Sequence, residues 1–220
     1  MKSKLIVFEG VSGSGKTSII DSYLKHRDSK DNIITNWFSL NSIKEISGKI
    51  DNYVTMSADY YSLIYALEFY ARLELQILPE LNRDNNVISH RYIYTPLSHD
   101  SVRGSSEKLL NMLYTESFIL NPNIIFFMDT KPLTAYERII HYRIPTFFEC
   151  GLDIEYSNHL NEGLKRFKNG FFNSDELRER YLYFQNQVYT KYQKILPNDT
   201  IYIDENKTLS EQLNYIMNYL

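Results

Sequence analysis

The chain has little of several features that mark particular classes of protein. Among its 220 residues there is one cysteine, Cys150, which excludes an internal disulfide and favours a reducing compartment. Its net charge of -3 lacks the basic surplus typical of proteins that bind long nucleic acids. No apolar run approaches the roughly 18 residues of a membrane-spanning helix, and the short N-terminal apolar run does not resemble a signal peptide. We therefore predict a cytoplasmic protein that binds neither a membrane nor long nucleic acid.

Glycine and proline are also scarce, at eight and six residues, and no repeat, low-complexity tract or proline-rich linker divides the sequence. With 43% hydrophobic residues, a chain of this length can bury a sizeable core. Segments typical of strands alternate with segments typical of helices. We predict a single α/β domain over residues 1–220, built on a five-stranded parallel sheet with helices on both faces.

The expected strands are short apolar runs rich in β-branched and aromatic residues. They are predicted at 5–8, 32–38, 87–89, 124–128 and 200–203. A first helix begins near Gly15, and apolar residues at helical spacing predict others over 58–81, 107–120, 133–142, 175–196 and 209–220. The polar segment 39–57 is expected to be irregular or weakly helical. Since ligands bind at the carboxyl ends of parallel strands, Gly10, His90 and Asp129 are expected to lie near a site.

The most specific motif follows the first strand. Residues 10–17 fit the phosphate-binding pattern G-x-x-x-x-G-K-[ST], between a strand and a helix as that pattern requires. Glycines let backbone N–H groups point at phosphate oxygens, and the start of the helix adds its positive dipole end. The Lys16 ammonium suits the outer phosphates, and the Thr17 hydroxyl can ligate magnesium. The alternative is a glycine-rich turn that binds nothing. We predict ATP contacts from Gly10, Ser12, Gly13, Ser14, Gly15, Lys16, Thr17 and Ser18.

A second segment, about 143–173, breaks the regular pattern. Pro145, Gly151, Gly163 and Gly170 are interspersed there with charged residues. This composition is typical of a mobile lid, and it fits an ordinary surface excursion nearly as well. We predict a lid.

Three stretches resemble successive landmarks of the thymidylate kinase family. FEGVSGSGKTS is similar to the family's FEG-x-D-G-x-GKT loop, HRYIYT to its DRY or DRF at a strand end, and NPNIIFFMDTKPLTAYERI to its PDL…LD segment before a helix. RYIYTPLSHDSVRG and FFECGLDIEYS look like a divergent branch of that family. The resemblance covers most of the chain. It implies a P-loop NTPase fold, magnesium and ATP, phosphoryl transfer to a nucleoside monophosphate (dTMP), a lid and usually a homodimer.

Phosphoryl transfer needs alignment and cations around a spread negative charge. Arg91 ends a strand and is placed to bridge the donor and acceptor phosphates; a structural ion pair is the alternative. The phosphate loop itself contains no arginine, so a further cation is expected from the lid side, where the candidates are Arg138, Arg143 and Arg166. The predicted catalytic residues are Lys16, His90, Arg91 and Arg143.

Four departures from the family's pattern accompany the matches. His90 replaces the aspartate of DRY, and an imidazole can accept a proton but is a poor magnesium ligand. Ser12 replaces the loop aspartate that faces the acceptor sugar. Residues 35–41 (TNWFSLN) replace the segment T-R-E-P-G-G-T. Phe69 stands where the family carries its thymine-reading arginine, and Arg72, one turn further on, is a candidate substitute.

The remaining assignments concern substrate, metal and acidic residues. Predicted substrate contacts are Glu9, Phe69, Arg72, Arg91 and Tyr92, and predicted metal ligands are Thr17 and Asp129. Asp129 fits a cap before the next helix equally well. Three roles are left open for Glu149 and Asp153: pairing with arginines, contact with the acceptor, or simple exposure to solvent. Two other functions stay open: a kinase with a different small-molecule acceptor, and a nucleotide-binding protein with little transfer activity.

Lys16→Ala tests the kinase interpretation. We expect it to abolish transfer to every acceptor, because the outer phosphates lose their mobile cation, and release of ADP from ATP measures this. Full activity of the variant would contradict the mechanism.

Overall fold

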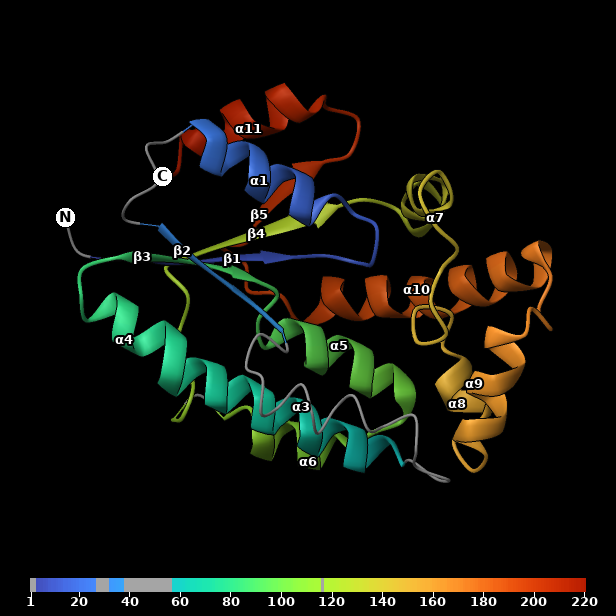
Figure 1. Cartoon of the computed structure of the whole chain (residues 1–220). Helices are drawn as coiled ribbons and strands as arrows, with labels where there is room; N and C mark the ends of the chain where they lie inside the picture. Colours follow the sequence, from blue (N-terminus) through green and yellow to red (C-terminus); the bar gives the residue numbers. More distant parts are fainter. Residues whose placement is uncertain (1–2, 27–31, 38–56, 116) are drawn as a thin grey trace.

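The computed structural model describes residues 3–26, 32–37, 57–115 and 117–220. All five predicted strands are present and pair in parallel, in the order β2-β3-β1-β4-β5 (Figure 1). Their bounds are β1 Leu5–Glu9, β2 Asn32–Asn36, β3 Asn86–His90, β4 Ile124–Asp129 and β5 Ile201–Asp204. The predicted α/β fold is therefore confirmed. The expectation for 39–57 falls almost entirely outside the described residues.

The helices form two layers, with a further group beyond the strand ends. Figure 1 shows α1 and α11 on one face of the sheet and α3, α5 and α6 on the other, with α10 running from beneath the sheet toward α8 and α9. The bounds are α1 Lys16–His26, α3 Ala58–Arg72, α4 Leu78–Leu81, α5 Tyr94–Arg103, α6 Glu107–Leu113, α7 Pro132–Ile140, α8 Leu152–Glu155, α9 Leu160–Lys168, α10 Ser174–Ile195 and α11 Leu209–Met217. Among the described helices, none is both long and apolar enough to cross a membrane.

The central strand β1 explains why both faces are covered. Leu5 and Val7 pack into an apolar cluster with side chains of α3, α5 and α10. Ile6 and Phe8 pack into a second cluster with side chains of α1 and α11. A strand buried on both faces reads as a continuous apolar run, as this one does.

The patterns used above do not predict helix α5. Its sequence is polar and contains Pro96, which argues against a helix interior. Pro96 lies in the first turn, however, where an N–H group has no intrahelical acceptor, and Gly104 ends the helix at φ 95°. Proline at the start and glycine at the end were the available signals. The next helix, α6, ends at Leu113 rather than at residue 120.

Residues 58–81 are helical throughout, as predicted, but one turn is widened. The π-helical turn η2 (Leu73–Ile77) joins α3 to α4, and the N–H of Leu78 donates to the carbonyl of Leu73, five residues back. Pro79 follows directly. A proline ring clashes with the carbonyl four residues earlier in a regular α-helix, so a wider turn accommodates it.

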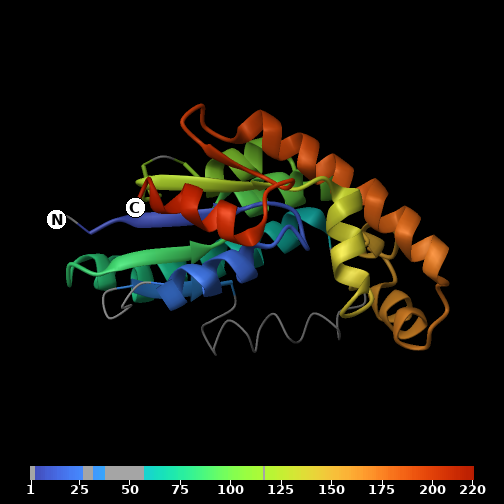
Figure 2. The same cartoon turned by 90° about the horizontal axis from the view of Figure 1, so that it is seen from above.

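The predicted lid segment contains α8 and α9, which pack against α7 and α10. Phe147, Leu152 and Leu160 share an apolar cluster with Tyr181 of α10. Figure 2 shows α8 and α9 along the far half of α10, away from the strands. Cys150 is buried in the same cluster, where its thiol faces the carbonyl of Leu177. Movement of this segment stays a prediction.

Phe69 lies in the core, and its truncation should lower stability. Its side chain is 0% exposed, and its ring centroid is 5.0 Å from that of Tyr92 and 5.6 Å from that of Tyr114. We expect Phe69→Ala to reduce the free energy of unfolding by about 3–5 kcal/mol, because the cavity is lined by rigid rings. Urea unfolding measures this, with Leu75→Ala at an exposed position of the adjoining turn η2 as the control. Reduced acceptor affinity with unchanged stability would contradict this placement.

Candidate functional site

The phosphate loop fits tightly between β4 and α7. Gly13 has φ 78°, and a Cβ there would lie 2.6 Å from the carbonyl oxygen of Ala135 and 2.8 Å from Cδ1 of Ile139. Gly10 has φ 142°, and its Cβ would lie 3.0 Å from the carbonyl oxygen of Met128. Both positions therefore require glycine, for conformation as well as for space.

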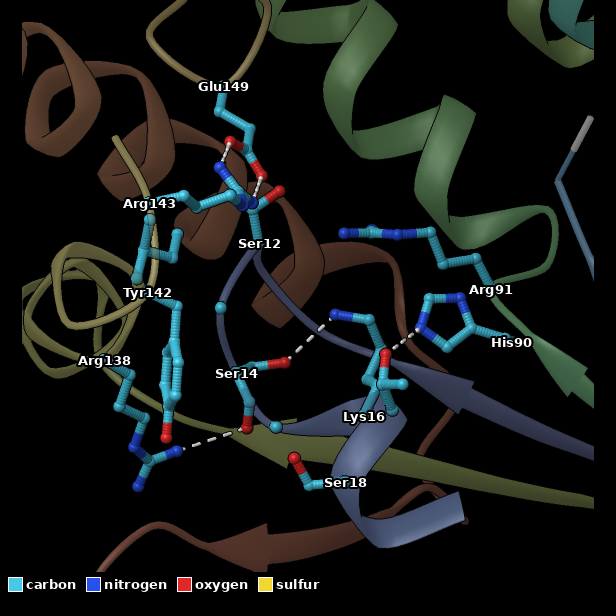
Figure 3. A pocket seen from close by; sticks show the side chains of 14 residues that line it. Ser12, Ser14, Lys16, Ser18, His90, Arg91, Arg138, Tyr142, Arg143 and Glu149 are labelled. Atoms are coloured by element: carbon cyan, nitrogen blue, oxygen red, sulfur yellow. Dashed lines mark hydrogen bonds and ion pairs between the residues drawn. The ribbon is translucent and has the colours of Figure 1, made fainter. Parts of the chain in front are cut away.

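Lys16 is the first residue of helix α1, and its side chain folds back onto the phosphate loop. The first amides of the helix have no intrahelical acceptors and can bind an anion. The Lys16 ammonium donates to the carbonyls of Gly10 (2.9 Å) and Val11 (2.8 Å) and to Oγ of Ser14 (3.0 Å; Figure 3). Burial, followed by the charge of Arg91, lowers the pKa of Lys16 well below its usual range. A phosphate would replace these loop acceptors.

Two adjoining cavities meet at Arg91. The larger, about 430 Å³, contains the loop from Ser12 to Ser18 together with His90, Arg91 and Arg143. The smaller, about 200 Å³, is lined by aromatic and polar side chains of α3, α5 and the lid segment. Ser12, Arg91 and Glu149 line both cavities. Figure 3 shows Arg91 and Lys16 on the same side of the loop, so one cation borders each half of a continuous site.

The backbone of Arg91 is held in an uncommon conformation. Its φ is 71°, in the left-handed region that side chains other than glycine rarely adopt. Its N–H donates to the carbonyl of Phe8 (2.9 Å), and its own carbonyl accepts from Oγ of Ser89 (2.6 Å) and Nη2 of Arg72 (3.2 Å). These three hydrogen bonds fix the direction in which the side chain leaves β3.

The buried carboxylate of Glu9 is connected to the same arginine through two hydroxyl groups. Its carboxylate is 0% exposed and accepts from the N–H of Tyr92 (2.7 Å), the hydroxyl of Thr95 (2.7 Å) and that of Tyr192 (2.9 Å). Burial raises the pKa of Glu9, and the charge of Arg91 opposes that rise. Nη1 of Arg91 donates in turn to Thr95 (3.1 Å) and Tyr192 (3.4 Å). The two hydroxyls therefore link a buried anion to the arginine at the site.

Four of the predicted substrate contacts lie in the interior. Glu9, Phe69, Arg72 and Tyr92 are all 0% exposed, and none is among the described residues that line the two cavities beside the phosphate loop. Arg72 stacks on Trp37 with 4.7 Å from Cζ to the ring centroid, and the Tyr92 hydroxyl donates to the carbonyl of Leu120. Arg91 alone of the predicted contacts lines the cavities. A motif places a residue at a strand end or on a helix but does not say which face it occupies.

Asp129 also points away from the loop. Its Oδ1 accepts a hydrogen bond from the Tyr189 hydroxyl of α10 and lies 3.8 Å from Nζ of Lys131. It is not among the described residues that line the larger cavity. Of the two predicted metal ligands, only Thr17 faces that cavity. Across the described ranges, no group of three or more His, Cys, Asp or Glu side chains could hold a metal ion by itself.

His90 takes the place beside Thr17. Its Nε2 lies 3.4 Å from Oγ1 of Thr17, and both residues line the larger cavity. Burial, reinforced by the charges of Lys16 and Arg91, lowers the pKa of His90 to about 3. The imidazole is therefore neutral at neutral pH.

The three candidate arginines of the lid side have different surroundings. Arg143 lines the larger cavity and forms two 2.7 Å hydrogen bonds with the carboxylate of Glu149. Arg138 also lines it, and its Nη1 donates to the carbonyl of Ser14 (3.3 Å). Arg166 stacks on the ring of Phe171 outside both cavities. Arg138 and Arg143 thus both border the larger cavity, and Arg143 is paired there with an acidic residue.

Helices α5 and α10 supply residues that the sequence analysis did not single out. Gln185 Oε1 accepts from the N–H of Ser12 (3.4 Å), and the Tyr181 hydroxyl donates to the Ser12 carbonyl (2.6 Å). Arg103 binds Asp153 at 2.6 Å beside the smaller cavity. No motif marks Tyr181 and Gln185, since their contacts depend on how the long helix α10 crosses the loop, whereas Arg103 lies in the stretch RYIYTPLSHDSVRG without a role assigned from the sequence.

Removal of the Glu149 charge should have a pH-dependent effect on stability. Burial alone would raise the pKa of Glu149, but hydrogen bonds from Arg143 and Thr146 hold it below its ordinary 4.5. A lowered carboxyl pKa stabilises the fold above that value and ceases to do so as the pH falls below it. We expect Glu149→Gln to lose about 0.5–1 kcal/mol at neutral pH and nothing in acid, by urea unfolding. With Glu162→Gln as the exposed control, a pH-independent loss would contradict the pairing.

Comparison with known proteins agrees with this geometry. The profile of the thymidylate kinase family matches residues 8–149. The chain is 31% identical over 217 residues to a probable thymidylate kinase 2 of Saccharolobus solfataricus, covering 96% of this chain and 92% of that protein. It is 27% identical to a thymidylate kinase of Leptospira interrogans, with the same coverage, and 32% identical over 153 residues to one of Ligilactobacillus salivarius, covering 65% and 73%. The chain belongs to the thymidylate kinase family.

Proposed function

We propose that this protein transfers the γ-phosphoryl group of ATP to dTMP. The observation that carries the proposal is the placement of Lys16 and Arg91 in one cavity, with Arg91 bordering a second. Membership of the thymidylate kinase family supports the reaction and the acceptor. Sequence departures at Ser12, Phe69 and His90 left other functions open, but no observation on the described residues favours a different acceptor or a protein without transfer activity.

The donor side follows from the loop. The amides at the start of α1 bind phosphate oxygens, and Lys16 exchanges its loop acceptors for the outer phosphates. Magnesium, which the family resemblance implies, fits here to the extent that Thr17 offers a hydroxyl ligand and the phosphates offer the rest. A divalent cation held by the Thr17 hydroxyl would supply charge neutralisation during phosphoryl transfer.

The acceptor side uses Arg91 and the smaller cavity. Arg91 reaches the acceptor phosphate while facing the loop, so it stabilises charge on both partners as the phosphoryl group moves. Tyr65 and Phe148 line the smaller cavity and offer flat apolar surfaces to a base. Phe69 and Arg72 lie in the interior, which supports assigning the base to the residues of this cavity.

The lid completes the proposal. Arg143, still paired with Glu149, would direct its remaining N–H groups at the phosphates of ATP when segment 143–173 closes, and so add the cation that the loop lacks. A homodimer, also implied by the resemblance, and a cytoplasmic location remain predictions. Leu63 and Leu67, about half exposed on α3, are apolar side chains that a second subunit would cover.

A panel of acceptors tests the function. We expect ADP release from ATP to be fastest with dTMP, compared with dUMP, dCMP, dAMP, dGMP and thymidine, because the family's relatives are thymidylate kinases. Arg91→Met should lower kcat with dTMP about a thousandfold, as loss of a transition-state arginine does. Arg83→Met, an exposed arginine on the loop before β3, is the matched control. Confirmed ATP binding without phosphorylation of dTMP would overturn the proposal.

A further inference from the structure

The surroundings of Thr17 lack a free carboxylate. Among the described residues lining the larger cavity, Glu149 is the one acidic side chain, and Arg143 holds both of its oxygens. The Glu9 carboxylate accepts three hydrogen bonds in the interior, and the Asp129 carboxylate accepts one from the Tyr189 hydroxyl on α10. Magnesium sites beside nucleotide phosphates ordinarily include one or two carboxylates. Here none of these carboxylates is directed at the cation position.

An imidazole occupies that place instead. β3 pairs with β1 so that His90 lies opposite Phe8, directly before the phosphate loop. Ile88, two residues earlier on the same face of β3, packs with Ile19 and Ile20 of α1, so this face of the strand is directed at the helix that carries Thr17. Figure 3 shows the His90 ring beside Lys16, the residue before Thr17 on α1.

The ring is oriented as a metal ligand would be. Its Nε2 lies 3.4 Å from Oγ1 of Thr17. Two neighbouring ligands, each about 2.1 Å from an octahedral metal, lie about 3.0 Å apart, so a small shift brings both atoms to one cation. We assign the ring proton to Nδ1, so that the Nε2 lone pair faces the Thr17 hydroxyl.

We propose that His90 Nε2 and Thr17 Oγ1 jointly ligate the divalent cation that accompanies ATP, and that the site therefore favours Mn²⁺ and Co²⁺ over Mg²⁺. Mg²⁺ takes oxygen ligands, whereas first-row transition metals accept imidazole, with affinity rising from Mn²⁺ to Co²⁺. The proposal rests on the proposed function for its donor, ATP, but not for its acceptor. On this proposal, the histidine at the position of the aspartate in the family's DRY motif changes which metal the site prefers and does not abolish the site.

Electron spin-echo modulation of bound Mn²⁺ tests the ligand directly. The protein is loaded with Mn²⁺ and inorganic tripolyphosphate, which contains no nitrogen, so any ¹⁴N coupling comes from the protein. We expect imidazole ¹⁴N modulation in the wild type and in His26→Asn, a control at the far end of α1, and its loss in His90→Asp. Absence of the modulation in the wild type, or of Mn²⁺ binding altogether, overturns the proposal.

Calorimetry tests the preference. The ratio of ATP affinities measured with Mn²⁺ and with Mg²⁺ should fall about tenfold in His90→Asp, as the loss of a ligand typically changes metal affinity. The same ratio with Co²⁺ should fall further. Ratios that are equal in the variant and the wild type overturn the proposal. If the ¹⁴N coupling is present but the protein does not phosphorylate dTMP, the proposed acceptor is wrong and the role of His90 stands. If the protein phosphorylates dTMP but shows no ¹⁴N coupling, the role of His90 is wrong and the proposed function stands.

Discussion

The structure depends on one buried carboxylate. Glu9 ends β1 without access to solvent and binds the backbone N–H after Arg91, a hydroxyl of α5 and a hydroxyl of α10. A buried charge is tolerated only where its hydrogen bonds are satisfied, so these three elements are held in one arrangement around it. That arrangement places Arg91 across from Lys16. The spacing between the two cations is thus set by an anion that lines neither cavity.

The phosphate loop could be predicted from the sequence because its conformation is local. Gly13 and Lys16 lie within one short motif between a strand and a helix, and backbone requirements determine most of its shape. The strands could be predicted because each is a contiguous apolar run. Helix α5 could not be predicted from apolar periodicity, since its first turn contains Pro96 and its inner face is polar.

The direction in which a side chain points was harder to predict than the helix or strand to which its residue belongs. Phe69 and Arg72 are on the predicted helix, but both point into the interior, where they pack behind Arg91. Asp129 is at the predicted strand end, yet its side chain lies on the face covered by α10. Sequence spacing gives neighbours along a helix or strand, whereas the direction of a side chain depends on packing between distant segments.

Lys16 and Arg91 are placed to act on one phosphate chain. A crystal structure with adenosine and thymidine joined through five phosphates measures this most directly, because the analogue spans both cavities at once. We expect Nζ of Lys16 and the guanidinium of Arg91 each to lie about 3 Å from oxygens of that chain. An Arg91 directed away from the phosphates, with Lys16 still bound to its own loop carbonyls, would contradict it.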